Sequence, residues 1–137
     1  MILISEILKG LKEQLETVCD NVFLEPLNAT DSQMNSFIEV TFPTSLTDNV
    51  EGSDDWWTDT IVQIDINVRD RMTRKSPNAS NPGAMDTLRA GVKHLFPLVI
   101  EGDTLRYKVT RPIELLVNVS DGGGFHYTRI QAMVRTI

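Results

Sequence analysis

Hydrophobic and polar residues alternate along residues 56–69, which read Trp-Trp-Thr-Asp-Thr-Ile-Val-Gln-Ile-Asp-Ile-Asn-Val-Arg. A period of two over this length predicts a long β-strand with one buried face. The polar face carries no His or Cys and no Ser beside a base, so we expect it to support or contact a partner rather than to catalyse a reaction. The buried face would carry Thr60, Val62, Ile64, Ile66 and Val68, and the other face Ile61, Gln63, Asp65, Asn67 and Arg69.

Two segments have the three- and four-residue spacing of amphipathic helices. The first is expected to end near Asp20 and Asn21, which favour turns. The second should begin with Asn81 as N-cap and Pro82 in the first helical position, and Pro97 should close it. The apolar stripes are Ile4, Ile7, Leu8, Leu11, Leu15 and Val18 in the first helix, and Met85, Leu88, Val92, Leu95 and Phe96 in the second.

Shorter alternating segments predict further strands at 22–27, 37–42, 105–110, 113–119 and 125–136. Pro26 favours an edge position for the first of these, and Pro112 marks a break between two others. The run Asp121-Gly122-Gly123-Gly124 supplies residues for a tight reversal. The expected fold is α+β, a single domain with two helices on one face of a mostly antiparallel sheet of about four to six strands, in the order α-β-β-β-α-β-β.

The formal net charge of −6 and the pI of about 4.8 argue against a protein that wraps nucleic acid, because phosphate binding needs clustered cations. Cys19 is the only cysteine, so an intrachain disulfide and a cysteine-based zinc site are excluded, and a buried filler role is expected. The apolar runs are far shorter than the roughly 20 residues that cross a bilayer. The N-terminal residues lack the pattern of a secretory signal, which favours a cytosolic origin.

Candidate chemistry is sparse. His94 and His126 are too few for a zinc site, and Ser120 and Asp121 beside His126 are no better than chance. The glycine turn lacks the following helix of a phosphate loop. The polar segment 44–55, which we call the acidic loop, does not have the spacing of a twelve-residue calcium loop. We therefore expect no enzyme activity, cofactor or metal. The acidic loop contains Asp48, Glu51, Asp54 and Asp55.

Three groups of residues are candidate subunit or partner contacts. Trp56 and Trp57 are adjacent, so they would point to opposite faces of the strand, and one of them is either shielded by the preceding loop or covered by a partner. The acidic residues Asp54 and Asp55 precede the strand. The one basic cluster of the chain follows it, at Arg69, Arg71, Arg74 and Lys75.

The order of elements resembles that of the tail terminator (tail completion) proteins of long-tailed bacteriophages. The resemblance rests on the strand Val62–Ile66, Val-Gln-Ile-Asp-Ile, then a polar loop, the helix Met-Asp-Thr-Leu-Arg-Ala-Gly-Val at residues 85–92, and a terminal hairpin. It implies a virion protein, assembled in the host cytoplasm, that forms a hexameric ring. Such a ring caps the tail-tube protein, stops polymerisation and joins the tail to the head-neck connector. An acidic ring suits a lumen through which DNA passes without being gripped.

Three alternatives remain open at this stage. The chain could be another phage neck or head-completion protein, which would bind the portal side instead of the tube. It could be a small enzyme with a pocket between the helices and the sheet, although its His, Cys and Ser content does not favour this. It could also be a cellular adaptor of similar architecture.

Overall fold

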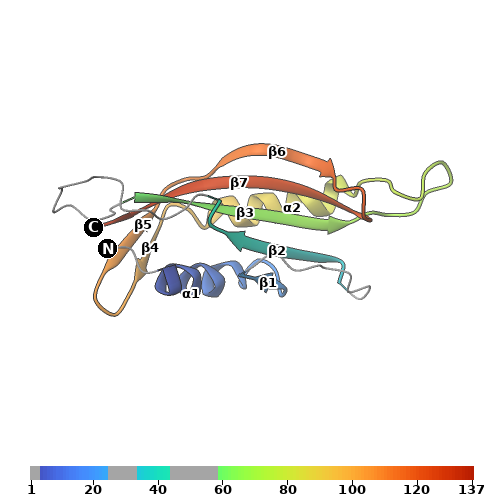
Figure 1. Ribbon diagram of the computed structural model, residues 1–137. Coiled ribbons are helices and arrows are strands. Elements are labelled where there is room, and N and C mark those ends of the chain that lie inside the picture. The colour runs from blue at the N-terminus through green and yellow to red at the C-terminus, as the bar shows by residue number, and fades with distance from the viewer. Residues whose placement is uncertain (1–3, 25–33, 44–58) are drawn as a thin grey trace.

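The computed structural model places two helices and seven strands among the residues that it describes, 4–24, 34–43 and 59–137 (Figure 1). The sheet order is β1-β2-β3-β7-β5-β4, and β6 also pairs with β7. Only the β1–β2 pair is parallel, so the predicted mostly antiparallel α+β class is confirmed. The elements are α1 (Ile4–Leu15), β1 (Val22–Phe23), β2 (Ser36–Thr41), β3 (Asp59–Arg69), α2 (Pro82–His94), β4 (Leu98–Glu101), β5 (Arg106–Val109), β6 (Ile113–Ser120) and β7 (Phe125–Thr136).

The predicted strand number and order were wrong after α2. Four strands follow this helix, whereas the predicted order has two and the predicted segments at 105–110, 113–119 and 125–136 number three, and β4 was not expected at all. β4 spans only Leu98–Glu101 and begins directly after Pro97. A strand of four residues is too short for an alternating pattern to be recognised. It exists because it pairs with β5 and places Ile100 against Gly10 of α1, a contact between segments far apart in the sequence.

The alternation of β3 was interpreted correctly. Thr60 is 6% exposed, Val68 is 3% exposed, and the three residues between them on the same face are fully buried. The inner face of β7 is buried in the same way, at Thr128, Ile130, Ala132 and Val134. Both helices add to this one core, α1 through Ile7, Leu11 and Leu15 and α2 through Met85 and Val92.

The long antiparallel pair β3–β7 forms the centre of the sheet, with a register that runs from Asp59 opposite Arg135 to Arg69 opposite Phe125. The other edge of β7 is shared. β5 pairs with its C-terminal end and β6 with its N-terminal half, so β5 and β6 lie end to end along one strand. This arrangement agrees with the break predicted at Pro112. β6 therefore lies at the rim of the sheet (Figure 1).

The predicted start of the second helix is confirmed, since the Asn81 side chain accepts a hydrogen bond from Ala84 N at 3.4 Å and Pro82 opens α2. The first helix ends earlier than expected, at Leu15, and continues as a hydrogen-bonded turn to Cys19, which is buried. The glycine reversal between β6 and β7 is also confirmed, with φ of +77° at Gly122 and +100° at Gly124.

Candidate functional site

The sheet face that points away from the core carries paired polar side chains on β3 and β7. Asp65 and Arg129 are directly opposite in register, and Arg129 donates from Nε and Nη2 to the two carboxylate oxygens at 3.0 and 3.2 Å. The next outward-facing pair is Gln63 and Gln131, in which Gln131 Nε2 donates to Gln63 Oε1 at 3.1 Å. The hydrogen-bonded Asp65 carboxylate raises the pKa of Arg129 above its ordinary value. These side chains satisfy one another, so this polar face is a pre-ordered surface suited to contact.

Asn67 extends this polar network toward β2. Its side chain is almost buried, and Nδ2 donates to Asp65 O at 3.2 Å and to Glu39 Oε1 at 3.4 Å. A shallow depression opens beside it, where the carboxylates outnumber the cations. Its lining residues are Glu39, Asp65, Asn67, Ser120, Asp121, Tyr127 and Arg129.

The predicted basic cluster divides into two residues that anchor neighbouring segments, Arg69 and Arg71, and two that lie near the tip of a loop, Arg74 and Lys75. Arg69 donates from Nε to Met34 O at 2.8 Å, and its guanidinium lies 4.8 Å from the centre of the Phe125 ring, so it joins the end of β3 to the segment before β2 and to the start of β7. Arg71 donates from Nε to Ser80 O at 2.8 Å and closes the base of the loop 70–80. Arg74 and Lys75 are exposed near the tip of this loop.

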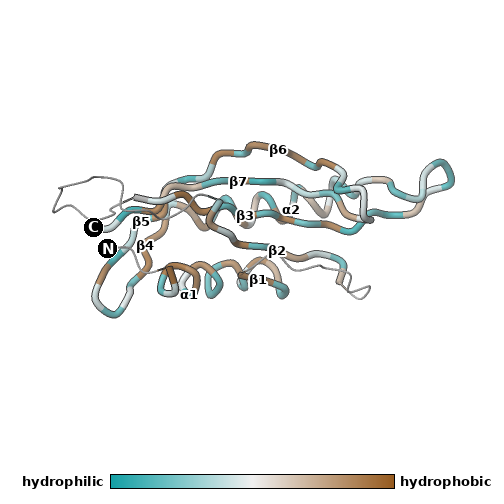
Figure 2. The backbone as a smooth tube through the Cα atoms, viewed as in Figure 1, coloured by the Kyte–Doolittle hydropathy of each residue, from teal (hydrophilic) through white to brown (hydrophobic). Residues whose placement is uncertain are grey.

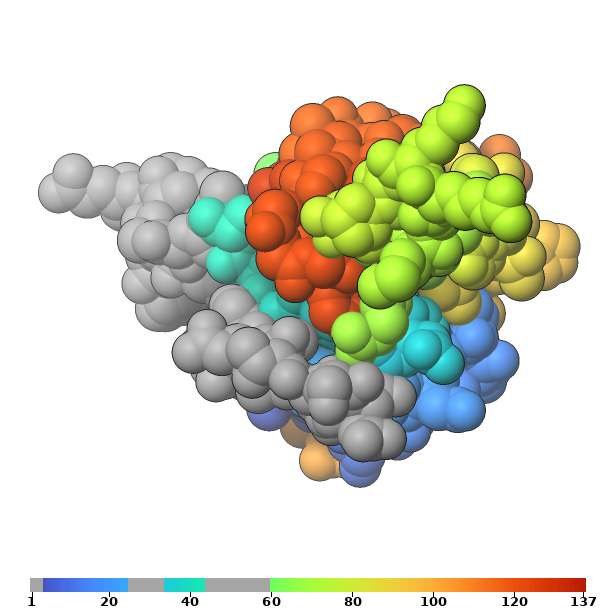
Figure 3. All heavy atoms as spheres, turned by 90° about the vertical axis from the view of Figure 1, so that its right-hand side faces the viewer, coloured from blue at the N-terminus to red at the C-terminus, as the bar shows by residue number. Residues whose placement is uncertain are grey.

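The basic loop, residues 70–80, extends beyond the ends of β3 and β7 (Figure 1) and protrudes from that end of the molecule (Figure 3). Its base is a short antiparallel bridge between Arg71 and Ala79, and a turn closed by Thr73 and Ser76 shapes its tip. A cavity of about 540 Å³ lies at its base and is lined by residues that include Arg69, Arg71 and Asn81. The loop therefore protrudes from the sheet, and two of its three cations, Arg74 and Lys75, lie near its tip, where they can face a partner.

Asp70 and His126 form a pair that the sequence did not predict. His126 Nδ1 lies 2.5 Å from Asp70 Oδ1, and the side chains are 13% and 4% exposed. His126 therefore pairs with a residue 56 positions away rather than with the neighbouring Ser120 or Asp121, which were considered from the sequence. The pair joins the start of β7 to the end of β3 and has a structural role at the base of the basic loop.

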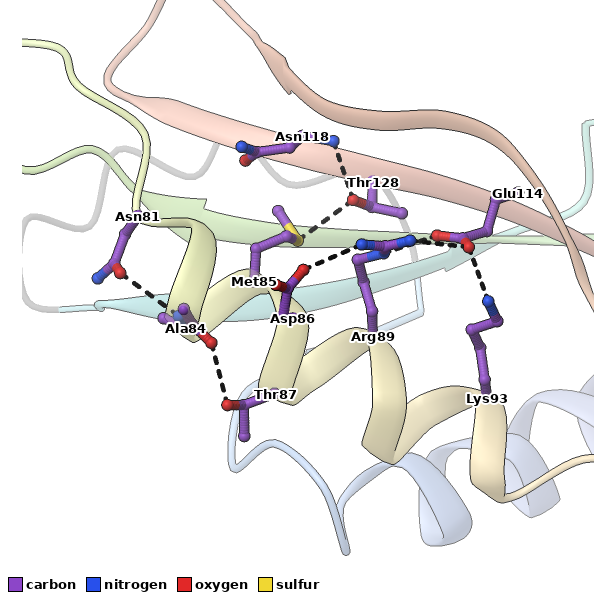
Figure 4. A network of polar contacts seen from close by, with 11 residues as sticks. Asn81, Ala84, Met85, Asp86, Thr87, Arg89, Lys93, Glu114, Asn118 and Thr128 are labelled. Atoms are coloured by element: carbon purple, nitrogen blue, oxygen red, sulfur yellow. Dashed lines mark hydrogen bonds and ion pairs between the residues drawn. The ribbon is translucent and has the colours of Figure 1, made fainter.

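A second unpredicted cluster fixes β6 to α2 (Figure 4). Glu114 accepts hydrogen bonds from Arg89 Nε at 2.7 Å, Arg89 Nη2 at 2.9 Å and Lys93 Nζ at 2.7 Å. The Arg89 hydrogen bonds, followed by the Lys93 contact, lower the pKa of Glu114 to about 2, although burial acts in the opposite direction. These contacts hold the inner side of β6 and leave its other side chains outside the core.

Five aliphatic side chains of β6 are exposed, with exposed fractions between 37% and 63%. Figure 2 shows this strand at the rim of the sheet as mostly hydrophobic, interrupted by hydrophilic positions. Two register shifts against β7 interrupt the alternation, so apolar side chains project from both the outer face and the rim. The sequence signal was the run of apolar residues in a strand that lacks strict alternation. We call this set the β6 ridge: Ile113, Leu115, Leu116, Val117 and Val119.

The remaining predicted contact residues lie outside the described residues. They are Trp56, Trp57, Asp54 and Asp55. Within the described part of the chain, no group of three or more His, Cys, Asp or Glu side chains is placed to hold a metal ion. The helices described there are also too short or too polar to cross a membrane.

Comparisons with known proteins support the fold but not a function. No protein-family model matches the chain, and no curated protein matches its sequence. A solved structure that carries no functional name is similar over 97% of this chain and 92% of its own, with a TM-score of 0.67. The sequence identity is 14%, so this similarity shows a shared fold alone.

Proposed function

We propose that this chain is a non-enzymatic virion assembly protein, a tail terminator. It would form a ring of identical subunits, most simply a hexamer, that caps the tail tube, stops its polymerisation and joins the tail to the head-neck connector. The observation that carries the proposal is the outer polar face of β3 and β7. Within the described residues no helix covers this face, its side chains are pre-paired, and a basic loop extends beyond its end.

The polar face suits a contact between identical subunits. Its ion pair and amide pair are fixed in register, so a neighbour would meet a constant pattern of donors and acceptors. The exposed Arg74 and Lys75 supply positive charge on a chain whose net charge is −6. An acidic surface of a neighbouring subunit or of the tube would attract this loop. The acidic predicted contacts Asp54 and Asp55 are candidates for that surface.

The net negative charge also suits a ring through which DNA passes. Specific or tight DNA binding needs clustered phosphate contacts, and an acidic lumen would oppose them. In this proposal DNA is a passing cargo and not a ligand. The protein would act in the tail and neck of the virion after assembly in the host cytoplasm.

The direct test combines electron microscopy with a tube-capping assay. Purified protein, alone and with polymerising tail-tube subunits, should appear as six-membered rings or as a cap at one end of each tube, and added protein should shorten the tubes. Retention on head connectors but not on tubes would instead identify another neck or head-completion protein. Failure to bind either structure would contradict the virion role and leave a cellular adaptor or an enzyme.

A further inference from the structure

The β6 ridge is the one cluster of exposed aliphatic side chains that the described residues form on a single element. The other exposed large apolar side chains are spread over α1, the basic loop, β4, β7 and the C-terminal residue, and Met133 of β7 lines a small depression together with Ile113 of the ridge. They are Ile4, Met72, Val99, Met133 and Ile137. An exposed apolar strand at a sheet edge invites association, and monomeric proteins usually blunt such edges with charge. β6 instead carries a single charged residue, Glu114, and Arg89 and Lys93 hold that carboxylate on the helix side.

The hydropathy pattern of β6 is symmetric about Leu116. Residues 113–119 read Ile-Glu-Leu-Leu-Val-Asn-Val, which is apolar-polar-apolar-apolar-apolar-polar-apolar in both directions. If two such strands lie antiparallel with Leu116 against Leu116, Ile113 meets Val119 and Leu115 meets Val117. Every apolar residue then has an apolar partner, as a two-fold contact between identical surfaces requires.

The face of the sheet on which each β6 side chain lies is consistent with the same antiparallel pairing. Ile113, Leu116 and Val119 are in register with Gln131, Arg129 and Tyr127 of β7, so they lie on the outer face. Glu114 bonds to α2, and the backbone N–H of Asn118 donates to the hydroxyl of the buried Thr128. In the paired strands, Glu114 of one copy and Asn118 of the other would therefore lie near the helix side. The three outer apolar residues of each copy would lie together on the outer face.

Charge complementarity extends this symmetry beyond the ridge. Arg111 precedes β6 and Asp121 follows it, and both are exposed. The register that centres on Leu116 places Arg111 of one copy opposite Asp121 of the other, once at each end of the contact. An opposite-charge pair at each rim favours this register over a shifted one.

We propose that a second copy of this chain covers the β6 ridge, with the two β6 strands antiparallel about a two-fold axis at Leu116. A head-to-tail contact would need a second, different apolar surface, which the described residues do not present. The inference goes beyond the proposed function. A ring uses head-to-tail contacts, whereas this two-fold contact would join two rings or two unassembled subunits.

Sedimentation of the full chain over a range of concentrations tests the contact. Five aliphatic side chains make a small interface, so we expect a concentration-dependent dimer that Leu116→Asp weakens by about tenfold or more. The matched control is Val99→Asp, which places the same charge at an exposed position on β4 and should leave the dimer unchanged. The milder Leu116→Ser variant and circular dichroism guard against a folding defect. Higher salt should also weaken the dimer, because the rim charge pairs are screened.

Disulfide cross-linking tests the symmetry. In a Cys19→Ser background, Leu116→Cys should cross-link to itself, whereas Ile113→Cys should cross-link efficiently only when mixed with Val119→Cys. A wild-type protein that stays monomeric at all concentrations would overturn the proposal. Rings that lose stability in Leu116→Asp while Leu116→Cys fails to cross-link would also overturn it, because the ridge would then serve the head-to-tail contact. Loss of tube capping without loss of the two-fold cross-link would contradict only the proposed function.

Discussion

Arg89 of α2 and Glu114 of β6 form a two-point ion pair, with Arg89 Nε 2.7 Å from Oε2 and Nη2 2.9 Å from Oε1. Lys93, one helical turn further along α2, donates to the same carboxylate at 2.7 Å. Glu114 is 17% exposed, so the pair is partly shielded from water. It fixes an edge strand that contributes little to the core, and this accounts for how β6 keeps its place while most of its apolar side chains face outward.

Glu114→Gln should reduce the free energy of unfolding by about 1–3 kcal/mol at neutral pH. The pKa of Glu114 is lowered from 4.5 to about 2 in the folded protein, chiefly by the Arg89 hydrogen bonds. Its contribution to stability is therefore present above pH 4.5 and is lost as the pH falls through about 2. Urea denaturation between neutral pH and pH 2 measures the effect, and the gap between wild type and variant should close at the acidic end. A gap that is independent of pH would show that the charge is not its source.

The Asp65–Arg129 pair should show a favourable coupling of about 0.3–1 kcal/mol in a double-mutant cycle with Asp65→Asn and Arg129→Gln. The side chains are 18% and 35% exposed, so the effect of the raised Arg129 pKa is partly screened by solvent. The pair Glu101–Arg106 is a matched control, because it is also directly cross-strand but is 65% and 57% exposed. The control should couple less. Equal coupling in the two cycles would mean that burial does not strengthen the Asp65–Arg129 pair.

Gly10→Ala should destabilise the fold by about 1–3 kcal/mol, although alanine is the better helix former. A Cβ at Gly10 would meet the side chain of Ile100 on β4, so α1 and β4 would have to separate. Gly83→Ala in α2 is the control, since a Cβ there meets nothing within 4 Å. It should be neutral or stabilising by up to about 1 kcal/mol. Thermal unfolding of both variants measures the difference, and a stabilised Gly10→Ala protein would contradict the close packing.

Reversing the charges of the basic loop tests its role in assembly. The double variant Arg74→Glu, Lys75→Glu should fold normally, because both side chains are exposed, but its rings or tube caps should be weaker and less sensitive to salt. The double variant Lys9→Glu, Lys108→Glu, at exposed positions on α1 and β5, makes the same change in net charge and is the control. Arg71 is a poorer site for this test because it closes its own loop through Ser80. Unchanged assembly of the double variant would exclude the loop as a contact.

Local patterns predicted the elements that have a single buried face. The alternation in 59–69 and 125–136 placed both long strands, and the stripe from Met85 to Val92, with Asn81 and Pro82 before it, placed α2. β4 was missed because a strand of four residues has almost no period, and its position depends on β5 and on Ile100 against α1. The basic cluster was visible in the sequence. That Arg69 is anchored by Met34 and Phe125 was not visible, because those partners lie about 35 and 56 residues away.

The sequence by itself determined which residues are apolar on one side, where the helices begin and where the glycines reverse the chain, because these depend on neighbours a few residues apart. Only the tertiary structure decided that β5 and β6 share one edge of β7, that Glu114 is held by Arg89 and that His126 pairs with Asp70. The same packing left the β6 ridge outside the core. Burial is a property of all the elements packed together, so an apolar run in the sequence cannot show whether its cover comes from the same chain or from another.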